Sequence, residues 1–189
     1  MKKWISVLLC LCFAAIGAAF AETAATEAPA AEMTAEELYQ AGRTAHEAGD
    51  FAKEMEYYRL AADAGSVDGL RGIGNLYANG EGVDTDPEKA LEYYDLAAAQ
   101  GDAKSFYNIG LLYHYGEVGT ADIGKAIEYY LKSGELGFAD AWTMLASLYH
   151  YGEGVEQDLG KAAEYYQKAA DQGDTSVYYT LGAMYYRGE

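Results

Sequence analysis

Small and apolar residues along this chain recur at the three- and four-residue spacing of amphipathic helices, in short blocks separated by glycine-rich turns. The blocks themselves repeat every 36 residues, as the positions of Tyr77, Tyr113, Tyr149 and Tyr185 show. A fixed period of this size is typical of a stacked solenoid. The pattern therefore predicts an all-α solenoid whose repeating unit is a hairpin of two short helices.

The expected order is about four hairpins followed by a final, unpaired helix. Each helix is too short to be stable alone, so we expect stacking on its neighbours to stabilise it. The predicted ranges are 35–48 and 51–64, then roughly 67–78 and 87–100, 103–115 and 124–136, 139–151 and 160–172, and a last helix at about 175–186.

Residues with special helix-end chemistry recur at the same period. An aspartate precedes each second helix, where its side chain can accept the free N–H groups, and a glycine follows each second helix, where a left-handed conformation is needed. The aspartates are Asp50, Asp86, Asp122 and Asp158, and the glycines are Gly65, Gly101, Gly137 and Gly173.

Small residues inside the helices predict close packing. Glycine within a helix costs about 1 kcal/mol relative to alanine, so its recurrence indicates contact with a neighbouring helix. Four first-helix positions align in this way, namely Gly74, Gly110, Ala146 and Gly182. On the second helices, the tyrosines of the buried side lie four residues after Glu54, Ala90, Ala126 and Ala162.

Three short motifs carry a family resemblance. LYANGEGV at 76–83, KALEYY at 89–94 and AAAQG at 97–101 return as YHYGEGV at 149–155, KAAEYY at 161–166 and AADQG at 169–173. These motifs resemble the Sel1-like repeat family, a relative of the tetratricopeptide repeats. The resemblance covers about residues 33–189 and implies a right-handed superhelix. The third repeat departs from the pattern at 116–119, and the first lacks the long turn.

The N-terminus predicts export. A basic start at 1–3, an apolar run at 4–19 and the small-x-small sequence Ala19-Phe20-Ala21 are typical of a secretory signal peptide over residues 1–21. Residues 22–32 are small and acidic, and we expect a disordered leader there. These features predict a protein of the bacterial periplasm or a secreted protein. Cleavage would remove both cysteines, Cys10 and Cys12, and leave no thiol.

Charge and side-chain chemistry narrow the function classes. The chain holds 13 basic and 30 acidic residues and a net charge of −17, which argues against nucleic acid and anionic membranes as partners. His114 and His150 are one repeat apart but have no evident third ligand, so we expect no metal. We also expect no cofactor and no catalytic activity, because neither a nucleophile–base set nor a carboxylate pair is recognisable.

The resemblance implies that the first helices line a concave, protein-binding surface. Tyrosine and arginine dominate binding hot spots, and we expect a protein or peptide to bind there, with tyrosines as anchors and Arg71 or Lys104 orienting an acidic group. Host contact and envelope regulation are the settings that the family suggests. The candidate groove residues are Arg71, Asn75, Lys104, Tyr107, His114, Tyr115, His150, Tyr151, Tyr179 and Tyr186.

Other interpretations remain open at this point. The pairs at 114–115 and 150–151 can simply end a helix and cover the next repeat. The protein can also be an enzyme that acts on cell-wall or β-lactam compounds, as the resemblance allows, or a structural spacer without a ligand.

Overall fold

The computed structural model describes residues 30–188. The predicted signal peptide and residues 22–29 of the predicted leader lie outside the described residues. The chain divides into a unit that ends at Thr34 and a unit that begins at Ala35. In the first unit Ala30–Glu32 forms a 3₁₀ turn, η1, closed by a hydrogen bond from the Met33 N–H to the Ala30 carbonyl at 3.4 Å. These three residues are the last of the expected leader, residues 22–32.

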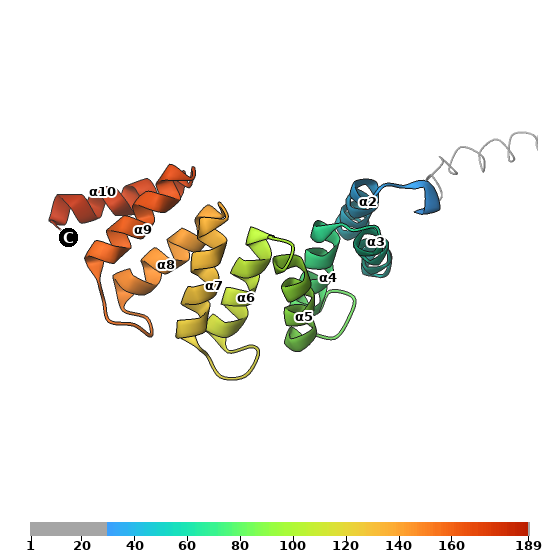
Figure 1. The fold of residues 1–189 in the computed structure, drawn as a ribbon, viewed down its shortest axis with the longest axis horizontal. Coiled ribbons are helices and arrows are strands. Elements are labelled where there is room, and N and C mark those ends of the chain that lie inside the picture. The colour runs from blue at the N-terminus through green and yellow to red at the C-terminus, as the bar shows by residue number, and fades with distance from the viewer. Residues whose placement is uncertain (1–29, 189) are drawn as a thin grey trace, which may run out of the picture. The chain divides into compact units, whose positions relative to one another are not determined.

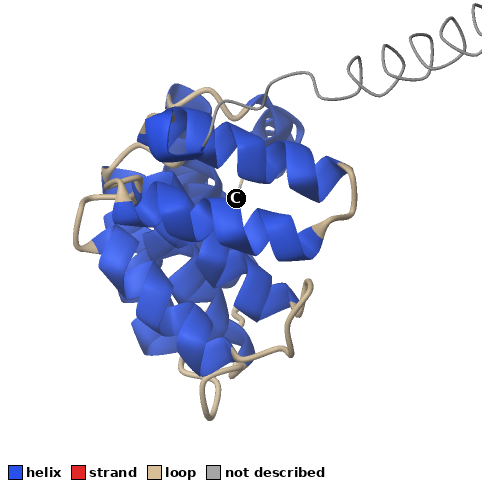
Figure 2. Ribbon diagram, turned by 90° about the vertical axis from the view of Figure 1, so that its right-hand side faces the viewer, coloured by secondary structure: helices blue, strands red, loops and turns tan. Residues whose placement is uncertain are grey.

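The second unit consists of short helices joined by turns, and the described residues contain no strand (Figures 1 and 2). This confirms the predicted all-α solenoid. None of the helices in the described part of the chain combines the length and apolar character needed to cross a membrane. The helices are α2 (Ala35–Glu47), α3 (Phe51–Asp63), α4 (Val67–Asn79), α5 (Pro87–Ala98), α6 (Ala103–Tyr115), α7 (Ile123–Glu135), α8 (Ala139–Tyr151), α9 (Leu159–Asp171) and α10 (Tyr178–Arg187).

Sequential helices pack as hairpins. The closest packing lies within the pairs α2–α3, α4–α5, α6–α7 and α8–α9, and each pair also packs on the next one. The core runs between the two layers of helices. Ala90, Ala126 and Ala162 of the second helices are fully buried, and so is Tyr130. Because every repeat buries its small residues against a neighbour, each hairpin depends on the ones beside it.

The glycines inside the first helices make room for tyrosine rings of the second helices. A Cβ atom at Gly74 would lie 2.5 Å from the ring of Tyr94, and one at Gly110 would lie 2.5 Å from the ring of Tyr130. The same relation joins Gly42 to the ring of Tyr58. The predicted close contact is thus confirmed at Gly74 and Gly110 but is wrong at Gly182, where a Cβ atom would have nothing within 4 Å. The contact at Gly42 also shows which residues of the first repeat correspond to those of the later ones.

The predicted helix ends are also confirmed. Each of the four aspartates accepts a hydrogen bond from the backbone N–H three residues later, such as Asp158 from Lys161. The glycines after the second helices have positive φ, 95° at Gly173 for example. These local interactions explain why the predicted helices before the last one begin and end within one or two residues of the observed ones.

The last helix differs from the prediction at its start. Thr175–Val177 forms a 3₁₀ turn, η2, and the α-helix begins only at Tyr178. The Asp174 side chain accepts from the Ser176 N–H, one residue earlier than in the other capped helices, and the Tyr178 N–H donates to the Thr175 carbonyl. This tighter hydrogen-bond spacing is that of a 3₁₀ turn.

Candidate binding surface on the first helices

The first helices α4, α6, α8 and α10 carry all ten predicted groove residues, and we call the surface that they form with α2 the first-helix face. Two depressions lie on this face. One holds about 320 Å³ and is lined from α2, α3, α4 and the turn after α4. The other holds about 230 Å³ and is lined from α4, α5, α6 and the turn after α6. Asn75 lines both depressions, and Tyr115 lines the second.

Exposed tyrosines are the most prominent feature of this face. Tyr115 and Tyr151 occupy the same repeat position at the ends of α6 and α8, and they are 64% and 72% exposed. Each ring stacks on the imidazole that precedes it, at centroid distances of 4.6 Å for Tyr115 and 4.7 Å for Tyr151. In α10, Tyr179 and Tyr186 are more exposed still, Tyr186 reaching 92%.

The two histidines on which these tyrosine rings stack are themselves buried or partly buried. His114 is buried, with Nδ1 3.2 Å from the Tyr130 hydroxyl and Nε2 3.2 Å from a carboxylate oxygen of Glu153 in the next repeat. His150 is partly buried, and its Nδ1 has no hydrogen-bond partner among residues 30–188. The geometry at His114 fits the alternative in which this side chain covers the next repeat, because little of it is left to meet a partner.

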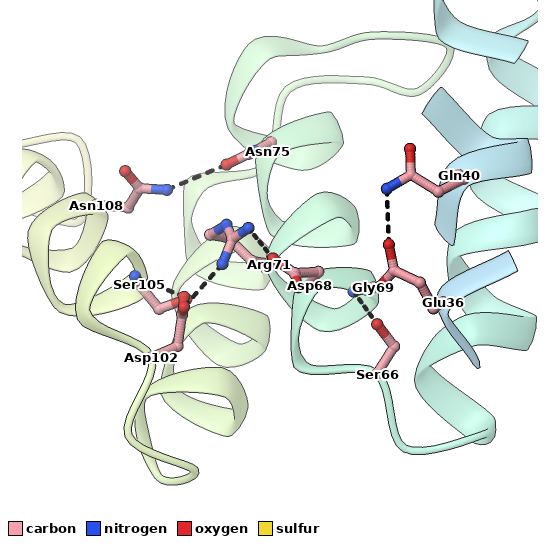
Figure 3. Close-up of polar contacts among 10 residues, drawn as sticks. All are labelled: Glu36, Gln40, Ser66, Asp68, Gly69, Arg71, Asn75, Asp102, Ser105 and Asn108. Atoms are coloured by element: carbon pink, nitrogen blue, oxygen red, sulfur yellow. Dashed lines mark hydrogen bonds and ion pairs between the residues drawn. The ribbon is translucent and has the colours of Figure 1, made fainter. Parts of the chain in front are cut away.

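Arg71 is held inside the protein. Its guanidinium is largely buried and donates to Asp102 at 2.8 Å and to Asp68, as Figure 3 shows. Burial acts to lower the pKa of Arg71, but the two carboxylates outweigh this effect and leave the pKa raised. The charge is therefore neutralised by the protein's own aspartates. We do not retain Arg71 as the group that orients a partner, whereas Lys104 of α6 is exposed.

Arg71 belongs to a series of contacts that join one repeat to the next. Its position recurs at Tyr107 and Thr143. Arg71 and Tyr107 each reach the residue just before the next first helix, and Thr143 reaches the residue just before η2. The Tyr107 ring lies 5.1 Å from the ring of Phe138, and the Thr143 hydroxyl donates to Asp174 at 2.7 Å. An ion pair, an aromatic contact and a hydrogen bond from a hydroxyl to a carboxylate thus join successive repeats. Tyr107 has a structural role that the sequence did not reveal.

Asn75 is likewise tied to its neighbours. Its side-chain oxygen accepts a hydrogen bond from the Tyr94 hydroxyl at 2.8 Å. It accepts another from the Asn108 amide at 3.1 Å, which Figure 3 shows. Burial raises the pKa of Tyr94 and keeps its hydroxyl a donor. Sequence reasoning missed Asn108, whose repeat position holds Gly72 and Met144 elsewhere and so gives no periodic signal.

A second polar cluster lies in the larger depression, and no predicted site residue belongs to it. His46 Nδ1 is 3.0 Å from Glu54 Oε2 and 3.6 Å from Glu81 Oε2. Glu54 is only 2% exposed, whereas its repeat position holds alanine in the other hairpins. A glutamate among buried alanines was the signal that could have located this cluster.

Comparisons with known proteins agree with the fold. The profile of the Sel1 repeat matches residues 28–66, 67–102, 104–138 and 139–174. The crystal structure of a Sel1 repeat protein from Oxalobacter formigenes is similar over 86% of this chain and 68% of that one, with 27% identity and a TM-score of 0.73. A comparison with curated protein sequences gave no match.

Two further solved structures are similar. The protective antigen c5321 of uropathogenic Escherichia coli strains, which displays the same repeat fold, is 30% identical over 84% of this chain with a TM-score of 0.68. This chain spans only 35% of that protein. Helicobacter pylori cysteine rich protein B is 24% identical over 67% of this chain and 91% of its own, with a TM-score of 0.52, and shares the fold. Because the four profile matches cover most of the sequence, the chain belongs to the Sel1 repeat family.

Proposed function

We propose that this protein is an exported scaffold that binds a protein or peptide segment on its first-helix face. Sel1 repeat proteins generally act as scaffolds for protein interactions rather than as enzymes. The observation that supports a specific surface is the pair Tyr115 and Tyr151, two exposed aromatic rings in equivalent positions of consecutive repeats. We propose no catalytic role.

The two tyrosines have the properties of binding anchors. Each offers a large amphipathic ring whose position is set in advance by stacking on the preceding histidine. A ring that is already ordered loses little conformational entropy when a partner covers it, so more of the contact energy appears as affinity. An extended segment lying across α6 and α8 would meet both rings and gain from both contacts.

The surroundings of the rings suggest the chemistry of the partner. The net charge of −17 favours a basic protein, since long-range attraction speeds association. Within the face, Lys104 is an exposed cation of α6 and can orient a single acidic group of the bound segment. Apolar or aromatic side chains between such charges would cover Tyr115 and Tyr151.

The setting of this binding follows from the predicted signal peptide over residues 1–21. We propose that the protein acts in the bacterial periplasm or outside the cell. The similarity to a protective antigen of uropathogenic Escherichia coli supports contact with a host as one setting, and regulation of an envelope complex is the other.

A capture experiment with a matched control tests the proposal. The protein is immobilised and exposed to envelope and host extracts, alongside the double variant Tyr115→Ala/Tyr151→Ala. The control is Leu96→Ala/Leu136→Ala, which removes two exposed apolar side chains, one on α5 and one directly after α7. We expect a captured protein to be lost from the tyrosine variant, by about tenfold or more in affinity for hot-spot residues, and retained by the control.

The opposite pattern would contradict the proposed surface. If the captured protein binds the tyrosine variant as well as the wild type, or is lost only from the leucine variant, then the first-helix face is not the binding site. Far-ultraviolet circular dichroism of each variant verifies that the helices are intact, as expected for substitutions of exposed side chains.

A further inference from the structure

All three histidines of the chain occupy the same position within their repeats. For His46 the 36-residue period does not show this, because the turn in the first repeat is shorter. Gly42 contacts Tyr58 as Gly110 contacts Tyr130, so these glycines correspond. His46 lies four residues after the first of them and His114 four residues after the second. Each of these two histidines also reaches the glutamate in the turn of the next repeat, Glu81 at 3.6 Å and Glu153 at 3.2 Å.

Of the surroundings of His46 and His114, only those of His46 contain a second carboxylate. Glu54 of α3 stands where the later second helices carry Ala90, Ala126 and Ala162, all fully buried. An ionised carboxylate in such a position is costly unless it has a cationic or hydrogen-bonding partner. The protein supplies the His46 ring, whose Nδ1 lies 3.0 Å from Glu54 Oε2. Packing alone does not explain a glutamate at this buried position, because alanine fills the same position in every other repeat.

The donor atoms of the cluster lie close enough to one another to bind a single metal ion. His46 Nδ1, Glu54 Oε2 and a carboxylate oxygen of Glu81 all lie within 4.8 Å of one another, the single group of this kind within residues 30–188. Ligands at about 2.1 Å from a tetrahedral Zn²⁺ are about 3.4 Å apart. The 3.0 Å and 3.6 Å separations from His46 bracket that value. Glu81 lies in the turn after α4, where its longer separation can close.

The surroundings suit an ion with an open coordination position. The cluster faces the depression of about 320 Å³, which leaves space for water beside the ion. Tyr58 lines the same depression, and burial together with the nearby Glu54 carboxylate raises the pKa of its phenol. Two other charges, Arg43 and Glu47, line the same depression and offset each other in sign.

We propose that His46, Glu54 and Glu81 bind a divalent transition-metal ion of the zinc type, with water in the remaining position. The pair His114–Glu153 provides a comparison within the same molecule, since it repeats two of the three donors but has Ala126 in place of the buried glutamate. The proposal is independent of the binding role of Tyr115 and Tyr151.

The test measures Zn²⁺ affinity and stoichiometry by isothermal titration calorimetry on untagged, chelator-treated protein. We expect one ion to bind the wild type. Glu54→Ala introduces the residue of the other repeats and is therefore compatible with the fold. Loss of this ligand should lower the affinity at least about tenfold, since outer-shell changes alone reduce metal affinity by 10- to 100-fold. His46→Ala should have the same effect.

A matched control and a second readout complete the design. Glu153→Gln removes the glutamate that corresponds to Glu81 from the two-donor pair, and it should leave the affinity unchanged. Co²⁺ bound at the site should give the intense visible absorption of a tetrahedral ion in the wild type and lose it in Glu54→Ala. Absence of Zn²⁺ binding by the folded wild type, or equal binding by wild type and Glu54→Ala, would overturn the proposal.

Discussion

A methyl group added at Gly110 should destabilise the protein, although alanine is the better helix former. The substitution Gly110→Ala places a Cβ atom 2.5 Å and 2.7 Å from two ring carbons of Tyr130. The ring would have to move by about an ångström to reach an ordinary contact. Tyr130 is fully buried and its hydroxyl lies 3.2 Å from His114, so the ring has no free space to enter.

The magnitude follows from three contributions. Overpacking of this kind costs about 1–3 kcal/mol. Displacing the Tyr130 hydroxyl from His114 adds about 1 kcal/mol for a weakened hydrogen bond. Replacing a mid-helix glycine by alanine returns about 1 kcal/mol. We therefore expect Gly110→Ala to lower the free energy of unfolding by about 1–3 kcal/mol.

The same substitution at Gly182 is the matched control. Gly182 has the equivalent position in α10, but a Cβ atom there would have nothing within 4 Å. Gly182→Ala should therefore keep the gain in helix propensity without the clash and leave stability unchanged or raise it by up to about 1 kcal/mol. Urea denaturation followed by circular dichroism at equilibrium measures both variants.

The sign of the difference decides the outcome. If Gly110→Ala is as stable as Gly182→Ala, the tyrosine ring does not depend on the missing Cβ atom, and the packing argument for the recurring glycines is wrong. A change in the slope of the denaturation curve without a change in its midpoint would indicate altered cooperativity between repeats rather than strain.

Two further predictions concern buried polar groups. Arg71→Met should lower the free energy of unfolding by about 2 kcal/mol, because it leaves the largely buried Asp102 without its cation while Ser105 still donates to that carboxylate. Urea denaturation checks this, and an effect no larger than that of Lys89→Met in an exposed ion pair would refute it. The second prediction concerns Tyr130, whose pKa is raised above its ordinary value of 10.0 by burial. The fold favours the neutral phenol, so the contribution of Tyr130 to stability should be constant below about pH 10 and fall as the pH rises further. Ultraviolet titration of tyrosinate should show exposed tyrosines ionising first and the buried class only as the helices unfold, and a single transition for all tyrosines with the helices intact would contradict it.

The sequence by itself determined the helices of this protein and their ends. The aspartate before each second helix and the glycine after it act on backbone groups a few residues away. Such short-range interactions can be predicted from the sequence, because the residues involved are only a few positions apart. They also recur in every 36-residue repeat, which makes the pattern recognisable. The one departure, at Thr175–Val177, arose where the aspartate cap engages a nearer N–H group.

The roles of the individual groove candidates were decided only by the tertiary structure. Arg71 meets an aspartate 31 residues away, and the equivalent Tyr107 and Thr143 meet partners of different chemistry. These pairs do not appear as a repeating pattern in the sequence. Any two residues that can interact will join the repeats, so the residue types differ from one repeat to the next. By contrast, Tyr115 and Tyr151 could be selected from the sequence, since they end the helices next to a glycine turn where a ring is left exposed.

The proposed metal site shows most clearly the difference between what the sequence determines and what the tertiary structure decides. The sequence placed Glu54 on the buried side of its helix, but the shorter turn of the first repeat shifted His46 out of the 36-residue register, so the correspondence with His114 was invisible. Only stacking brings His46 to Glu81, 35 residues later, in the next hairpin. Helix formation depends on neighbours along the chain. A polar cluster between repeats depends instead on side chains that meet across a packed interface. The packing of one hairpin on the next determines which side chains meet there.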